Sequence, residues 1–95
     1  MDLKTFKLSL REQTPPETSQ ALQALWYDAK GEWDKAHQLA QQVPDPIGAW
    51  VHAYLHRVEG DESNAGYWYR RAHKPHSEAS LPEEWDEIAS ALLSD

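Results

Sequence analysis

The sequence predicts an all-α protein in which two antiparallel helical hairpins lie between a short N-terminal helix and a C-terminal capping helix. Apolar residues recur at helical spacing in five stretches, and glycine or proline separates these stretches. No two alternating segments are present that could pair as a β-sheet. The 95 residues are expected to form one domain with one core. Its expected parts are an N-terminal segment (1–16), a first hairpin (17–43), a second hairpin (46–72) and the capping helix (80–94).

The N-terminal segment fits two patterns. Phe6, Leu8 and Leu10 alternate as in a strand, whereas Leu3, Phe6 and Leu10 share one face of a helix. Because no second strand is present, we expect a short helix that docks late or frays. The prolines at 15–16 end it, since proline disfavours helix at the residue before it.

The first hairpin is expected to contain helices over about 17–30 and 32–42. Gly31 stops the first of these helices and permits a tight turn. The residues at helical spacing are Leu22, Leu25, Trp26 and Ala29 in the first helix, and Trp33, Ala36, Ala40 and Val43 in the second.

The second hairpin begins with a helix over about 46–59 that is apolar on most sides. Such a helix should be central and largely buried. We expect Asp45 to cap it, Pro46 to occupy its first turn and Gly60 to end it, while Asp61 caps the next helix. Its broad apolar face contains Ile47, Trp50, Val51, Tyr54, Leu55 and Val58, and a second stripe contains Ala49, His52, Ala53 and His56.

The capping helix has a strong start signal. Ser80 and Glu83 have the spacing of a capping box, in which each side chain bonds to the other residue's backbone N–H. The face that this helix packs inward is expected to contain Trp85, Ile88, Ala89 and Leu92.

Small residues repeat between the two hairpins at a constant offset of 29 positions. Alanine lets two antiparallel helices approach closely, and glycine permits the turn between them. The pairs are Ala24 with Ala53, Gly31 with Gly60, and Ala36 with Ala65.

This spacing resembles the tetratricopeptide repeat over about 20–72. Tyr27, Tyr69 and Ala72 stand where that family places its aromatic and small residues, and the run 65–72 is similar to the second helix of Sel-one-like repeats. The resemblance implies stacked hairpins with a concave binding face, although an offset of 29 is shorter than the usual repeat. The runs 26–37 and 49–61 also resemble a group of small uncharacterised bacterial proteins, which implies a bacterial origin and no known activity.

The composition excludes several function classes. A net charge of −7 disfavours binding to nucleic acid and to anionic membranes, and the absence of cysteine excludes disulfides and thiolate metal sites. The sequence shows no signal peptide and no membrane-spanning stretch, so a cytoplasmic protein is expected. No catalytic motif is present, and we expect neither an enzyme nor a bound cofactor.

The leading functional hypothesis is a protein-interaction module that binds a protein or peptide partner of unspecified identity. If the hairpins stack as the resemblance implies, an aromatic groove with one arginine suits an extended or helical peptide. The residues expected to line the groove are Trp50, Tyr54, Arg57 and Trp68. In the alternative, the capping helix fills the groove and makes it part of the core. A third hypothesis is a structural homo-oligomer subunit whose tryptophans are buried against a second copy of the chain. The sequence leaves open whether the protein is a monomer or a homodimer.

Two histidines provide a competing hypothesis of metal binding. His52 and His56 are four residues apart on one helix, so both rings can point to one side. The third ligand could come from His73, His76 or Glu59. The plainer interpretation, which we favour from the sequence, is a pair of buried histidines hydrogen-bonded to neighbouring helices.

Cationic residues gather in the second hairpin and after it, and together they could hold an anion through arginine forks. A plainer interpretation is again available, because cations near a helix C-terminus are stabilised by the helix dipole. The candidate anion-binding residues are Arg57, Arg70, Arg71 and Lys74.

Overall fold

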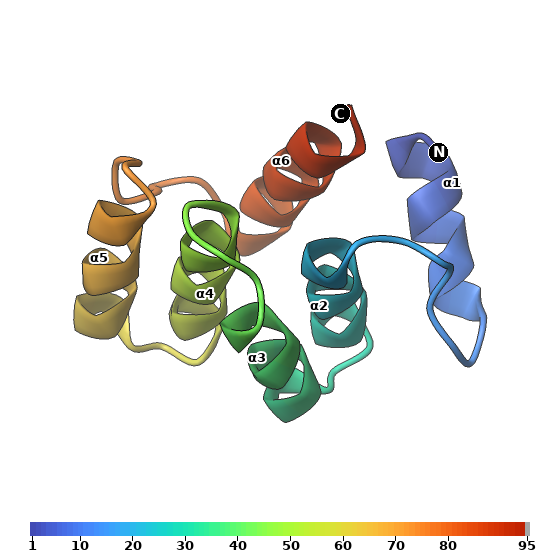
Figure 1. The fold of residues 1–95 in the computed structure, drawn as a ribbon, viewed down its shortest axis with the longest axis horizontal. Helices are drawn as coiled ribbons and strands as arrows, with labels where there is room; N and C mark the ends of the chain where they lie inside the picture. The colour runs from blue at the N-terminus through green and yellow to red at the C-terminus, as the bar shows by residue number, and fades with distance from the viewer. Residues whose placement is uncertain (95) are drawn as a thin grey trace.

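The computed structural model describes residues 1–94, and within them it contains helices and no strand (Figure 1). The predicted all-α class is therefore confirmed. The elements are α1 (Leu3–Leu8) with a 3₁₀ turn (Ser9–Arg11), α2 (Gln20–Ala29), α3 (Trp33–Gln41), α4 (Ile47–Val58), α5 (Glu62–Arg71) and α6 (Leu81–Leu93).

Helices α2 and α3 pack against each other, as do α4 and α5, and α3 packs against α4 (Figure 1). Two glycines make the turns within these pairs. Gly31 has φ 84° and Gly60 has φ 87°, a left-handed conformation that glycine adopts without strain. In both turns the residue after the glycine donates its backbone N–H to the carbonyl five residues earlier, in the pairs Glu32–Tyr27 and Asp61–His56.

Four alanines allow the paired helices to approach closely. Each has no exposed surface, and they are the ones expected from the 29-residue offset: Ala24, Ala36, Ala53 and Ala65. The two hairpins thus have the same turn and the same small contact residues.

Helix α4 is the centre of the molecule, as its apolar pattern predicts. Every residue from Gly48 to His56 is buried. The expected N-cap is wrong, because α4 begins after Pro46 without a side-chain cap. The Asp45 carboxylate instead accepts hydrogen bonds from Arg71 of α5, at 2.7 Å from Nη2 and 3.1 Å from Nε.

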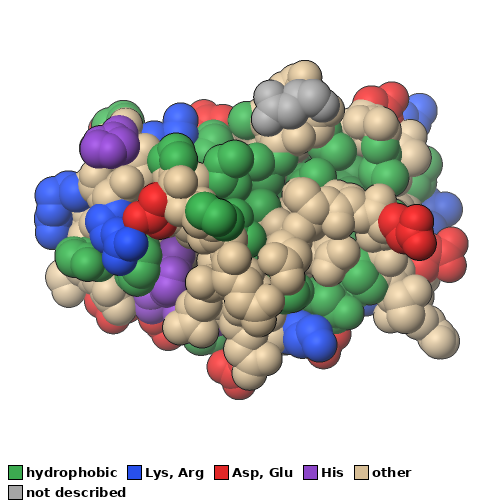
Figure 2. Space-filling view, viewed as in Figure 1, with side chains coloured by type: hydrophobic (Ala, Val, Ile, Leu, Met, Phe, Trp, Pro, Cys, Tyr) green, Lys and Arg blue, Asp and Glu red, His purple; other side chains and the backbone are tan. Residues whose placement is uncertain are grey.

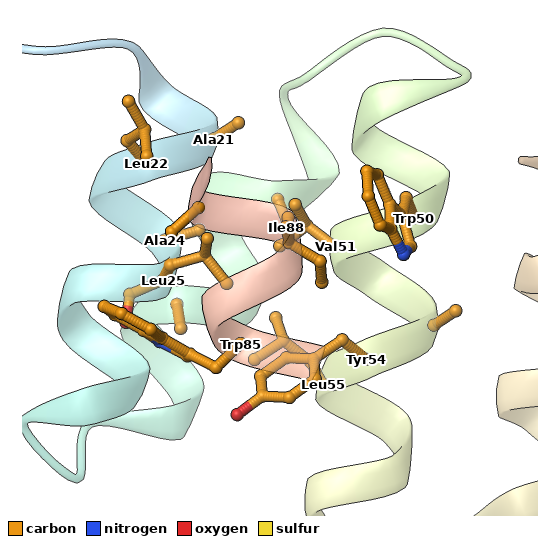
Figure 3. Close-up of a cluster of buried hydrophobic side chains, with 14 of the residues drawn as sticks. Ala21, Leu22, Ala24, Leu25, Trp50, Val51, Tyr54, Leu55, Trp85 and Ile88 are labelled. Carbon is orange, nitrogen blue, oxygen red and sulfur yellow. The ribbon is translucent and has the colours of Figure 1, made fainter. Parts of the chain in front are cut away.

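Helix α6 covers α4 and α2. The predicted capping box is present, with Ser80 and Glu83 each accepting from the other's backbone N–H at 3.2 Å. Trp85 donates its indole N–H to the Leu25 carbonyl at 2.9 Å. Figure 3 shows Trp85 and Ile88 of α6 among the apolar side chains of α2 and α4. This helix therefore completes the core.

Helix α1 is packed along the core, and the expectation of a frayed helix is wrong. Phe6 has no exposed surface and stacks on Trp85 with ring centroids 5.7 Å apart. Trp26 donates its indole N–H to Ser9 Oγ at 3.2 Å. No helix in residues 1–94 has the length and apolarity needed to cross a bilayer.

Candidate metal centre

Three histidines from two helices converge beside the core. His37 lies on α3, while His52 and His56 lie one turn apart on the face of α4 that packs against α3. One ring nitrogen from each lies within 4.8 Å of the other two. His52 and His56 are buried and His37 is half-buried. We call these residues the three-histidine cluster.

The His37 and His52 rings meet through their Nε2 atoms, which are 2.8 Å apart. At this distance one nitrogen carries a proton and donates it to the other. Two imidazoles bound to one tetrahedral zinc ion, each at about 2.0 Å, hold their nitrogens about 3.3 Å apart. For both nitrogens to bind one metal ion, the bridging proton must leave, the nitrogens must move about half an ångström apart, and both must turn toward the ion.

Glu59 orients the third ring. Its carboxylate Oε1 lies 2.5 Å from His56 Nδ1, so Nδ1 carries the proton and donates it to the carboxylate. His56 Nε2 is then left with a free lone pair, the form that binds a metal. A carboxylate on the far nitrogen of a metal-bound histidine is the usual outer partner in such sites.

Two tryptophans hold the cluster from its sides. Trp68 of α5 stacks on His52 with centroids 3.8 Å apart and planes 9° apart. Trp33 of α3 stacks on His37 at 4.7 Å and 12°, and its indole N–H donates to the Leu55 carbonyl at 2.8 Å. These stacks restrict rotation of both histidine rings.

The environment favours the neutral form of His37 and His52. Burial lowers the pKa of His52 to about 4, and the positive charges of His37, His56 and Arg71 act in the same direction. Burial also lowers the pKa of His37, with His56 as the next cause. Neutral imidazole is the form that ligates a metal, so at pH 7 His37 and His52 do not have to lose a positive charge before they bind one.

One side of the cluster borders a pocket of about 460 Å³ between the α3–α4 loop and α5. His52, Trp68, Arg71, Asp45 and Gly48 are among its lining residues. Figure 2 shows histidine side chains reaching the surface between α3 and α5, next to a basic and an acidic side chain. A metal ion or a small molecule has a route to His52 from this pocket.

The sequence pointed to two of the three histidines and missed the third. His76 lies apart, with its Nε2 2.9 Å from Glu62 Oε1, and Glu59 holds His56 from outside the cluster. In the structure the residue that joins His52 and His56 is His37, and neither linker histidine belongs to the cluster. His37 is four residues after Trp33 and three before Ala40, on the inner stripe of its helix, and this spacing was the available signal.

The predicted aromatic groove is filled. Trp50 and Tyr54 are 8% and 4% exposed, and Arg57 donates to the buried Glu84 of α6 and to the Ala79 carbonyl. Trp68 is separate from these residues and stacks on His52. The alternative in which the capping helix fills the groove is the one that the structure shows.

The four predicted anion-binding residues do not form one site. Arg57 pairs with Glu84, Arg71 pairs with Asp45, and the Lys74 ammonium lies 4.0 Å from the Trp50 ring centre. Arg70 is exposed on α5. Each of the first three cations is thus directed to a different partner.

No family model matches this chain, and neither a curated protein nor a solved structure matches it.

Proposed function

We propose that this protein binds a divalent transition-metal ion, with zinc as the first candidate, through His37, His52 and His56. The observation that carries the proposal is the convergence of three imidazole nitrogens within 4.8 Å. Nitrogen ligands of this kind suit zinc, copper, nickel and iron better than magnesium or calcium, which prefer oxygen.

The surroundings support a site that holds its ligands in place. Glu59 selects the proton position on His56, and the two indoles fix the rings of His37 and His52. Three protein ligands are the number found in zinc sites that keep one coordination position open for water or a small molecule. We therefore propose an exchangeable ligand position on the metal.

A second set of possible metal ligands, two of them carboxylates, lies beside the three-histidine cluster and is the less favourable site. His56, Glu59 and Asp61 also lie close enough to share an ion. However, Asp61 already accepts the Asn64 backbone N–H as the cap of α5, and Glu59 is committed to His56. Metal binding by the three-histidine cluster breaks one contact, the bond between His37 Nε2 and His52 Nε2, and leaves the cap of α5 and the Glu59–His56 bond in place.

Isothermal titration of the metal-free protein with zinc tests the proposal. We expect one equivalent to bind, and we expect His37→Gln to lose this binding. His37 is half-buried, so its replacement disturbs the core less than replacement of His52. The matched control is His73→Gln, which removes an exposed histidine beyond the end of α5 and should bind zinc like the parent protein.

Glu59→Gln separates a metal site from a merely structural cluster. Loss of an orienting carboxylate weakens metal affinity by roughly 10- to 100-fold in known sites. The same loss should leave the helical spectrum unchanged, because Glu59 is exposed. Failure to take up zinc, nickel or copper, or equal uptake by parent and His37→Gln, would exclude this site.

A further inference from the structure

A second pocket lies on another face of the molecule, where α1, α2, α4 and α6 meet. Its volume is about 290 Å³, just below the range of about 300 to 1,000 Å³ for small-molecule sites. The walls are mainly apolar and contain Leu10, Ala29, Leu81, Pro82 and Trp85. It shares no residue with the three-histidine cluster.

A carboxylate lies in this apolar setting. Asp28 is half-buried and lines the pocket. Its Oδ2 atom accepts a hydrogen bond from the Tyr54 hydroxyl, with the two oxygens 3.1 Å apart. Figure 3 shows Tyr54 and Trp85 extending into the region between α2 and α4. The Tyr54 hydroxyl stays protonated and can donate this bond, because burial and the nearby Asp28 charge raise its pKa.

Asp28 has no cationic partner in residues 1–94, since no ion pair there includes it. Two nearby lysines bind other groups. Lys30 Nζ donates to the Leu10 and Glu12 carbonyls at 2.7 and 3.0 Å, and Lys7 pairs with Asp86 at the pocket rim at 3.0 Å. A carboxylate removed from water is costly to leave uncompensated.

The cost of burying the Asp28 carboxylate is visible in its pKa. Burial raises the pKa of its carboxyl group, and the single bond from Tyr54 only partly opposes this. A positive charge placed against the Asp28 carboxylate would offset the cost of its burial. An apolar group attached to that charge would cover Leu10, Leu81 and Trp85.

We propose that this pocket binds a small molecule with a protonated primary amine on an apolar or aromatic body. The ammonium group binds the Asp28 carboxylate, which Tyr54 positions, and the body packs on Trp85 and Leu81. This site is independent of the proposed metal centre.

The experiment uses phenethylamine as the probe and 2-phenylethanol as its uncharged analogue. Each is titrated into ¹⁵N-labelled protein at pH 7, and backbone and indole shifts are followed by NMR. Phenethylamine should shift resonances of Leu10, Ala29, Leu81 and the Trp85 indole, with a dissociation constant at least tenfold lower than that of 2-phenylethanol.

Two substitutions complete the test. Asp28→Asn should weaken phenethylamine binding at least tenfold and leave 2-phenylethanol binding unchanged. Asp34→Asn, which removes an exposed carboxylate on α3, should leave both unchanged. Equal binding of the two probes to the parent protein, equal binding of phenethylamine by Asp28→Asn, or shifts confined to another face would overturn the proposal.

Discussion

Gly48 stands where the α3–α4 loop comes closest to the first turn of α4. A Cβ atom built on Gly48 would lie 1.9 Å from the Val43 carbonyl oxygen and 2.7 Å from the Val43 carbonyl carbon. Both are backbone atoms and cannot rotate away. The residue also lines the pocket next to His52, so this close packing helps to shape the entrance to the three-histidine cluster.

Gly48→Ala should therefore destabilise the protein, although alanine is the better helix former. Helix propensity alone favours alanine by roughly 0.5–1 kcal/mol, whereas forcing an atom into filled space costs about 1–3 kcal/mol or more. Urea denaturation monitored by circular dichroism measures the net effect.

Gly66→Ala in α5 is the matched control. Its new Cβ would meet only the ends of the His76 and Arg70 side chains, at 3.5 and 3.6 Å. This substitution should stabilise the protein by roughly 0.5–1 kcal/mol. A stabilising Gly48→Ala would contradict the packing described for the loop.

At the scale of elements, α6 is held to α4 and α5 by a buried polar contact. Glu84 is 1% exposed and accepts hydrogen bonds from Arg57 Nη1 at 2.5 Å and from the Tyr69 hydroxyl at 2.6 and 2.7 Å. Burial and this carboxylate raise the pKa of Tyr69, which keeps the hydroxyl protonated as a donor. Both carboxylate oxygens of Glu84 thus accept a hydrogen bond.

Glu84→Ala should loosen α6 and destabilise the protein by about 3–5 kcal/mol, because it breaks a buried ion pair. It leaves Arg57 with only the exposed Glu62, 3.9 Å from Nε, as an anionic partner and removes the acceptor of the Tyr69 hydroxyl. Glu87→Ala, three residues along the same helix and exposed, should change stability by less than about 0.5 kcal/mol. The free energy of unfolding in urea distinguishes the two. Similar losses in both variants would mean that the buried contact does not hold α6.

The elements differ in how far the sequence predicts them. Local signals sufficed for the hairpin turns at Gly31 and Gly60 and for the capping box at Ser80, because each depends on neighbouring residues. The docking of α1 was not predictable, since it depends on contact between Phe6 and Trp85, 79 positions apart. The third histidine was missed for the same reason, because His37 reaches His52 only once α3 packs on α4.

For the whole molecule, the neutral histidines link stability to pH. The folded-state pKa of His52 is about 4, below its ordinary value of 6.5. The unfolded chain therefore binds protons first on acidification, and the stability present above about pH 6.5 is lost as the pH falls toward 4. His37 contributes in the same direction, whereas Asp28, whose pKa is raised, opposes the loss at the acidic end.

In metal-free protein, the free energy of unfolding should fall by on the order of 3 kcal/mol between pH 7 and pH 4 from His52 alone. Urea titrations at several pH values give the slope. His52→Asn should flatten it, and the exposed His73→Gln should not. A slope that is unchanged in His52→Asn would show that the buried histidine is not its source.

Binding of one metal ion by His37, His52 and His56 together is the property that we propose for this protein. X-ray absorption at the zinc edge of the protein loaded with one equivalent of zinc tests it most directly. The structure predicts three imidazole nitrogens at about 2.0 Å, with one further oxygen or nitrogen from a small ligand. A spectrum of oxygen ligands with one imidazole or none would contradict the claim, because it would place the ion elsewhere on the protein.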